Sequence, residues 1–173
     1  MDLDSVKRSL EPAAGGDGLL CAGLPAKFYA KFVLHGLRVD LIEPGRILCS
    51  ITVPPRFVNS RGVLHGSMVV EMVDVVGSAV LYRADSPTSV SLEISVSYVD
   101  AAFVDVEMIG SKSKQTNCEL QRSSFKEEIE FDARILRFGN SIGVTTVEVR
   151  KKKTGKIIAQ ARHSKYLVAS SRL

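Results

Sequence analysis

The 173-residue sequence contains no tryptophan, and only 6% of its residues are aromatic. This scarcity leaves no base-stacking surface of the kind that proteins binding single-stranded nucleic acids use. No window reaches about 18 uninterrupted apolar residues, which argues against a transmembrane span. The N-terminus begins Met-Asp-Leu-Asp and lacks the basic-then-apolar order of a secretory signal. These absences disfavour nucleic-acid, membrane-spanning and secreted classes.

Cysteine is also sparse. Cys21, Cys49 and Cys118 show no metal-ligand spacing and leave an odd thiol. We interpret them as reduced thiols of an intracellular protein. With 45% hydrophobic and 24% charged residues, the composition is that of one globular domain with a sizeable core.

The C-terminal part of the chain has no acidic residue. Residues 150–173 include eight lysines and arginines, although the net charge of the whole chain is only +4. The lysine run at 151–153 fits a solvated turn between two strands, or a docking surface for an anion such as a nucleotide phosphate. We expect no nucleic-acid partner, because no recognition motif accompanies the charge.

A loop that leads into a long apolar run is the most informative segment that is present. The loop contains Asn59 and Gly62, and the run continues from Gly66 to Tyr82. This change of character predicts a buried helix that begins near His65 and Gly66.

Four polar residues interrupt the apolar run at a regular spacing. Ser67, Glu71, Asp74 and Ser78 are spaced i, i+4, i+7 and i+11, which places them on one narrow stripe of a helix. The other faces carry apolar residues, so the helix is expected to be buried nearly all round. Carboxylates near the interior require a structural or chemical reason.

The start of this helix is suited to an oxyanion. Backbone N–H groups at a helix N-terminus are unsatisfied, and Gly66 allows a ligand to approach them closely. The N–H of Gly66, assisted by the amide of Asn59, is positioned to donate to a carbonyl oxygen that becomes negative. His65 fits either a role in binding the same group or a structural role in the loop.

Asp74 is too far from His65 for both to meet one small group. Nine residues of helix correspond to about 13 Å of rise. Asp74 is therefore structural, or it acts on a carbonyl held by the His65 loop of a second chain. A two-fold dimer would create such a shared site twice.

The remaining pattern predicts an α+β fold in which a curved antiparallel sheet covers one helix. Residues 1–35 form a leader with short helices, one of them at 27–34, and residues 106–126 are a probable flexible insertion. In the clean alternation at 89–99, Ser91 lies on the side opposite Ile94 and Tyr98. Strands are expected at 36–43, 46–53, 89–99, 128–138, 142–151 and 156–168.

The pattern Asn59-x-x-Gly62-x-x-His65-Gly66, followed by Asp74, resembles the hotdog-fold thioesterases. The resemblance is to the phenylacetic-acid-degradation-type branch, and within it to the acyl-coenzyme A thioesterase 13-like group with its plant members. It covers 36–168, interrupted at 106–126, and includes the closing strand around 155–165. The implied domain at 36–169 has the hotdog fold, an antiparallel sheet wrapped around one long helix.

The resemblance implies hydrolysis of fatty acyl-CoA to free acid and CoA, without a metal or organic cofactor. It assigns Asp74 as general base or nucleophile and Gly66 as the donor that polarises the thioester carbonyl, with Asn59 and His65 about it. Ser91 would orient the water, and Ser67 is the small residue that follows the His-Gly pair. Glu71 lies outside the family pattern, so its role stays open.

The resemblance also implies a homodimer or homotetramer with shared active sites. Arg162 and Lys165, in the basic closing strand, would then bind the phosphates of CoA. The final residues, Ser171, Arg172 and Leu173, match a variant of the peroxisomal Ser-Lys-Leu address, which implies a peroxisomal import receptor as partner. A cytoplasmic location is the alternative.

Two other functions fit the same pattern. One is hydrolysis of an aromatic acyl-CoA such as 1,4-dihydroxy-2-naphthoyl-CoA, and the other is non-hydrolytic binding of acyl-CoA. A hotdog hydratase is disfavoured by the His-Gly then Asp order. The sequence does not fix the acyl chain length.

Overall fold

The computed structural model describes residues 28–59, 61–82, 89–103 and 127–167. The chain divides into two units, one that ends at His35 and one that begins at Gly36. The described part of the first unit is helix α2 (Phe28–Leu34), which lies within the short helix predicted at 27–34. The rest of the predicted leader, the insertion at 106–126 and the targeting tail at 170–173 lie outside the described residues.

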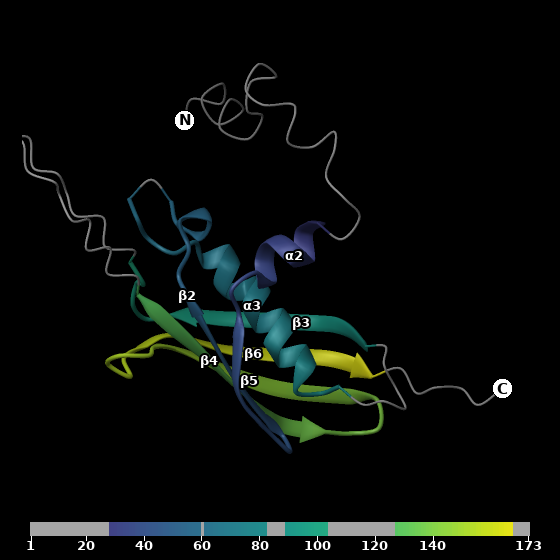
Figure 1. Ribbon diagram of the computed structural model, residues 1–173. Helices are drawn as coiled ribbons and strands as arrows, with labels where there is room; N and C mark the ends of the chain where they lie inside the picture. Colours follow the sequence, from purple (N-terminus) through teal and green to yellow (C-terminus); the bar gives the residue numbers. More distant parts are fainter. Residues whose placement is uncertain (1–27, 60, 83–88, 104–126, 168–173) are drawn as a thin grey trace, which may run out of the picture. The chain divides into compact units, whose positions relative to one another are not determined.

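The second unit contains an antiparallel sheet of six strands (Figure 1). The strand order is β1-β2-β4-β5-β6-β3, so β1 and β3 form the two edges. The pairs β1–β2, β4–β5 and β5–β6 are antiparallel hairpins, and β3 pairs with β6. The strands are β1 (Arg38–Glu43), β2 (Arg46–Thr52), β3 (Ser89–Tyr98), β4 (Glu128–Phe138), β5 (Ile142–Lys151) and β6 (Ile157–Leu167).

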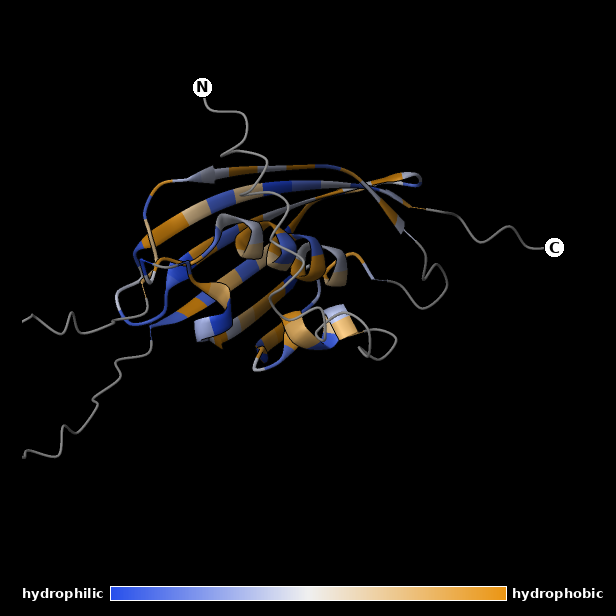
Figure 2. Cartoon of the chain, turned by 90° about the horizontal axis from the view of Figure 1, so that it is seen from above, coloured by the Kyte–Doolittle hydropathy of each residue, from blue (hydrophilic) through white to orange (hydrophobic). Residues whose placement is uncertain are grey.

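Helix α3 (Gly66–Ala79) lies across one face of this sheet, and a short 3-10 helix, η1 (Pro55–Phe57), precedes its loop (Figure 2). Hydrophobic and hydrophilic residues alternate along the strands, as expected when one face is packed and the other is solvated. The residues of α3 that are buried are Val69, Met72, Val73, Val76 and Gly77. The α+β prediction is thereby confirmed.

The burial of α3 is less complete than the sequence suggests. Val70 and Val75 are only half-buried, and Ala79 is exposed. The reason is geometric: the sheet of one chain covers one side of the helix. The prediction of a helix buried nearly all round is therefore wrong for the isolated chain.

The face of the sheet away from α3 carries an ion-pair network around Asp132, which is 3% exposed. The carboxylate of Asp132 accepts hydrogen bonds from Nε of Arg46 at 2.9 Å and Nη2 of Arg134 at 2.9 Å. Burial raises the pKa of Asp132, but these arginine hydrogen bonds outweigh it and hold the pKa below its usual range. The network fixes β2 to β4 on the side that the helix does not cover.

No helix in the described ranges is long and apolar enough to cross a membrane. Cys49 is buried and unpaired, and burial raises the pKa of its thiol to about 11. Cys21 and Cys118 lie outside the described residues.

Candidate active site

Asn59 folds the loop that precedes α3. Its Oδ1 accepts hydrogen bonds from the backbone N–H groups of Arg61 (2.9 Å) and Val63 (3.1 Å). Gly62 has a φ of +72°, in the left-handed region that glycine adopts without strain. Because the oxygen end of the Asn59 amide is bound to the loop, its NH2 group is the end that can donate to a ligand.

Helix α3 begins at Gly66 with His65 as the N-cap residue, as predicted. The backbone N–H of Met68 donates to the carbonyl of His65 at 3.0 Å. The N–H groups of Gly66 and Ser67 precede that bond, so they are the donors that the start of the helix presents. His65 is exposed and its side chain makes no capping hydrogen bond. Both predicted roles of His65 remain compatible with this position.

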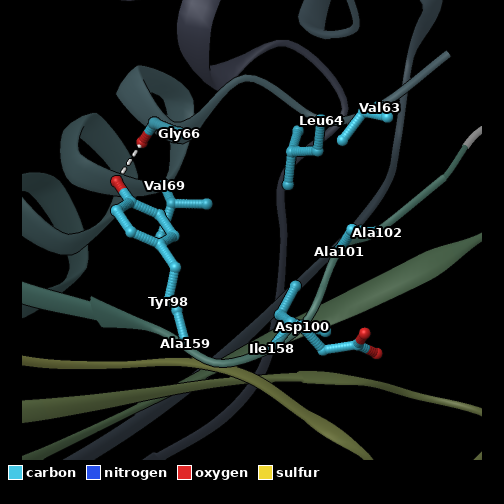
Figure 3. Close-up of a pocket in the computed structure, with 10 residues that line it drawn as sticks. All are labelled: Val63, Leu64, Gly66, Val69, Tyr98, Asp100, Ala101, Ala102, Ile158 and Ala159. Atoms are coloured by element: carbon cyan, nitrogen blue, oxygen red, sulfur yellow. Dashed lines mark hydrogen bonds between the residues drawn. The ribbon is translucent and has the colours of Figure 1, made fainter. Parts of the chain in front are cut away.

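Tyr98 explains why residue 66 must be small. Its hydroxyl donates to the carbonyl oxygen of Gly66 at 2.7 Å (Figure 3). A Cβ at position 66 would lie 3.1 Å from that hydroxyl, which is tighter than an ordinary van der Waals contact. The absence of a side chain at Gly66 therefore leaves room for the Tyr98 hydroxyl as well as for the approach of a ligand.

A pocket of about 260 Å³ lies beside this helix start (Figure 3). Its walls are mostly apolar, with the carboxylate of Asp100 at one end. The lining residues are Val63, Leu64, Gly66, Val69, Tyr98, Asp100, Ala101, Ala102, Ile158 and Ala159.

Asp74 lies two turns further along α3, in a separate cluster with Ser91 and His163. The Ser91 hydroxyl donates to Oδ1 of Asp74 at 2.7 Å. Nε2 of His163 lies 3.0 Å from Oγ of Ser91 and 3.2 Å from Oδ1 of Asp74. Tyr98 and Ser91 thus attach the two ends of β3 to the start and the middle of α3. The helix start and Asp74 are about 12 Å apart along the helix axis.

A β-bulge brings Ser91 to the side of the sheet that faces α3. Ser91 pairs with Lys165, whereas Glu93 pairs with Ser164 and Ile94 with His163, so Leu92 is the extra residue. A bulge inverts the alternation of the strand beyond it. Ser91 and Ile94 therefore lie on the same face, and the prediction that they lie on opposite faces is wrong.

Lys165 and Arg162 lie on opposite sides of the sheet. Lys165 is 6% exposed, and its Nζ donates to Oγ of Ser78 at 2.5 Å. Arg162 is exposed and lines a polar hollow of about 340 Å³ together with Ser95 and Glu148. Side chains of β6 alternate between the two faces of the sheet, so Arg162 and Lys165 point to opposite sides. The expectation that both bind the phosphates of one CoA molecule does not fit this arrangement.

His163 and Lys165 both have depressed pKa values. Burial lowers the pKa of His163, the Asp74 carboxylate opposes this effect, and the charge of Lys165 adds to the lowering. Burial likewise lowers the pKa of Lys165, with Asp74 opposing it. Asp74 itself is partly open, since its side chain is 40% exposed. The cluster therefore combines an accessible carboxylate with two buried nitrogen bases.

The four polar residues predicted to form a stripe on α3 (Ser67, Glu71, Asp74 and Ser78) differ in their exposure and contacts. Ser67 is exposed at the helix start, while Glu71 is half-buried. Asp74 is the carboxylate that contacts both Ser91 and His163. This favours Asp74 over Glu71 as the reacting carboxylate.

The basic run after β5 is largely neutralised by acidic side chains of the same chain. Lys151 lies 3.0 Å from Glu127, Lys152 lies 3.1 Å from Asp40, and Lys156 lies 2.9 Å from Asp100. The chain turns between β5 and β6 at this point. These contacts favour the turn interpretation of the lysine run over a docking surface for an anion.

No family model matches the chain. Acyl-coenzyme A thioesterase 13 from Homo sapiens is 28% identical over 136 residues, which cover 78% of this chain and 82% of the human protein. Thioesterase superfamily member 2 from Mus musculus has a solved structure with a TM-score of 0.64 and 26% identity, covering 82% of this chain and 89% of the mouse chain. The chain has the hotdog fold of these thioesterases and resembles them in sequence.

The hotdog fold is also shared with a more distant protein. A hypothetical thioesterase from Streptococcus pneumoniae, solved with coenzyme A, has a TM-score of 0.64 at 14% identity and covers 83% of this chain and 94% of its own. At that identity the likeness concerns the fold alone. The hotdog fold that the resemblance implied is confirmed.

Sequence reasoning assigns no role to His163, although the structure places it against Asp74. The signal available was its position on β6, where it alternates in register with the buried Ala159 and Ala161. A histidine on the buried face of a strand, opposite a helix that carries a carboxylate, is a candidate for contact with that carboxylate. Among the described residues, no group of three or more His, Cys, Asp or Glu side chains is placed to hold a metal ion.

Proposed function

We propose that this hotdog protein hydrolyses acyl-CoA thioesters to a free acid and CoA, with Asp74 as the base and without a metal or organic cofactor. The observation that carries the proposal is the contact of an accessible helix carboxylate with Ser91 and His163 in a fold shared with named thioesterases. A substrate with a CoA group is supported by the name of the human relative and by the coenzyme A in the Streptococcus pneumoniae structure.

In the proposed reaction, a water oxygen attacks the thioester carbonyl carbon while Asp74 takes the proton of the water. The carbonyl oxygen becomes negative and accepts hydrogen bonds from the N–H of Gly66 and the amide of Asn59. His65, at the N-cap, lies beside this oxyanion position. Collapse of the intermediate breaks the C–S bond, and the thiolate recovers the proton. One water and one thioester thus give one acid and one thiol.

We propose that each active site is shared between two chains of a homodimer or homotetramer. The helix start and Asp74 are about 12 Å apart within one chain, too far for a single carbonyl and its attacking water. The edge strand β3 offers a suitable interface, because its outer edge pairs with no other strand among the described residues and its residues Val90 and Leu92 are 56% and 57% exposed.

Subunit mixing tests the shared site. Asn59→Ala and Asp74→Asn each disable one half of a site, so each variant alone should be nearly inactive. A one-to-one mixture of randomly exchanged dimers should recover about a quarter of the wild-type activity, because half of the dimers hold one intact site. A mixture that stays as inactive as its components would show that each site lies within one chain.

We propose a fatty acyl-CoA as the substrate, with aromatic acyl-CoA as the competing class. Ser67 is exposed at the helix start and is a candidate contact for the bound ligand. Arg162 remains a candidate for the phosphates, whereas Lys165 is buried beside Ser78 and does not suit that role. Thiol release from a panel of straight-chain and aromatic acyl-CoAs distinguishes the classes. If the protein binds acyl-CoA but releases no thiol from any member, it is a non-hydrolytic binding protein.

A peroxisomal location is proposed from the last three residues, Ser171 to Leu173. The test is a fluorescent reporter that carries the whole chain, compared with a variant in which Leu173 is deleted. Punctate signal that becomes diffuse on the deletion supports the proposal. Diffuse signal from both reporters would contradict it and favour the cytoplasm.

A further inference from the structure

We infer that His163 is a positioning residue that holds the hydroxyl proton of Ser91 on Oδ1 of Asp74 and leaves Oδ2 to accept the proton of the attacking water. This inference rests on the proposed function. It follows from the number and direction of the hydrogen bonds in the cluster.

The direction of the bonds can be assigned by counting donors. Oδ1 of Asp74 is an acceptor, so Ser91, 2.7 Å away, donates its single proton to it. Oγ of Ser91 can then only accept from Nε2 of His163 at 3.0 Å, and Nε2 must carry a proton. The same N–H lies 3.2 Å from Oδ1 of Asp74, where an unprotonated nitrogen would face a carboxylate lone pair.

The other ring nitrogen supports this tautomer. Nδ1 of His163 has no hydrogen-bond partner among the residues that the structure describes. It lies where a Cβ on Gly77 would be 3.0 Å away, close to the packed surface of α3. A proton on Nδ1 would be a buried donor without an acceptor, which costs about 1–3 kcal/mol. His163 is 0% exposed, and the nearby ammonium of Lys165 disfavours a second positive charge.

This arrangement differs from a serine-hydrolase triad. In such a triad the histidine contacts serine with one ring nitrogen and the carboxylate with the other. Here a single nitrogen faces both residues, and serine donates directly to the carboxylate. His163 is therefore placed to fix Ser91 rather than to remove its proton. With Oδ1 engaged by Ser91 and His163, Oδ2 is the oxygen left for water.

A double-mutant cycle tests the inference. His163→Leu should lower kcat about tenfold or more in the wild-type background, because Ser91 loses the donor that fixes its proton. In a Ser91→Ala background the same change should alter kcat less than about twofold, because there is no hydroxyl left to orient. His163→Gln, which keeps an N–H near the same place, should restore part of the lost activity. Gln160→Ala, on the same strand but on the opposite face, is the control for general disturbance of β6.

Equal losses from His163→Leu in both backgrounds would overturn the inference, as would full activity of the single variant. Nitrogen-15 NMR of the histidines in the wild-type protein gives a second readout if the variants fail to fold. A neutral His163 with its proton on Nε2 at pH 7 supports the inference, and a proton on Nδ1 contradicts it. This NMR result is independent of turnover. A wild-type protein that releases no thiol would instead overturn the proposed function.

Discussion

Replacing Gly77 by alanine adds a methyl group where α3 packs against β5 and β6. The new Cβ would lie 3.0 Å from Nδ1 of His163, 3.1 Å from Oγ1 of Thr145 and 3.5 Å from Cγ2 of Val147. Distances of 3.0–3.4 Å are tighter than most Cβ contacts, so His163 and Thr145 would each have to move by a few tenths of an ångström. Neither His163 nor Thr145 can withdraw toward solvent, because both are fully buried.

Two opposing energies decide the outcome. Alanine is favoured over glycine in a helix interior by about 1 kcal/mol. Overpacking of a filled core costs about 1–3 kcal/mol. We therefore expect a net destabilisation of about 1 kcal/mol, which lowers Tm by about 3 °C for a chain of this length. Because His163 is one of the displaced groups, kcat should fall by more than the small loss of stability explains.

Thermal unfolding and thiol release measure the two effects in the same preparation. Ala79→Gly, at an exposed position near the end of the same helix, is the matched control for helix propensity. It should cost up to about 1 kcal/mol and leave kcat unchanged. A Gly77→Ala variant that is more stable than wild type and fully active would refute the close packing of α3 on His163.

Three further outcomes are expected. Asp132→Ala should lower the free energy of unfolding by about 2–3 kcal/mol in urea titrations, because Arg46 and Arg134 lose the buried carboxylate with which both pair. The control Glu43→Ala, at a side chain that is 52% exposed, should cost less than about 0.5 kcal/mol. Burial depresses the pKa of His163, so below about pH 6.5 the unfolded chain binds one proton more than the folded chain. The free energy of unfolding should therefore decrease, as the pH is lowered below about 6.5, by up to about 1.4 kcal/mol per pH unit. His163→Gln should remove that part of the slope between pH 7.5 and 5.5, and an unchanged slope would contradict the assignment. Tyr98→Phe should lose the hydrogen bond to Gly66 at a cost of about 1 kcal/mol, and an unchanged Tm would show that this bond does not hold the helix start.

The start of α3 could be predicted because its determinants are local. The loop residues Asn59 and Gly62 fold their own turn, and the polar-to-apolar change at His65 and Gly66 marks the first helical residue. The strands followed from alternation and turn residues in the same way. These features need no knowledge of the neighbouring strands.

The contacts of β3 could not be predicted, because they depend on which strand pairs with it. Alternation identifies residues 89–99 as a strand, but neither the pairing with β6 nor the bulge at Leu92 is visible in it. That bulge decides whether Ser91 faces α3. The placement of His163 against Asp74 follows from the same pairing, which explains why sequence reasoning overlooked this residue.

Lys165 shows the same dependence on tertiary structure. A lysine in a basic segment is normally solvated, whereas this one lies on the inward face of β6 and donates to Ser78 of α3. Its neighbour Arg162, three residues earlier, lies on the opposite face. The count of positive charges in the segment therefore overstated the cationic surface that the fold offers to a ligand.

The role of Asp74 is tested most directly by thiol release from acyl-CoA, measured with the wild-type protein and with Asp74→Asn on the best substrate of the panel. Wild type should release one thiol per acid formed. The variant should lose about 10²–10⁴-fold in kcat, the range of general base catalysis, while it still binds a non-hydrolysable acyl-CoA analogue. An Asp74→Asn variant that turns over at the wild-type rate, or a wild-type protein that releases no thiol from any member of the panel, would contradict the account.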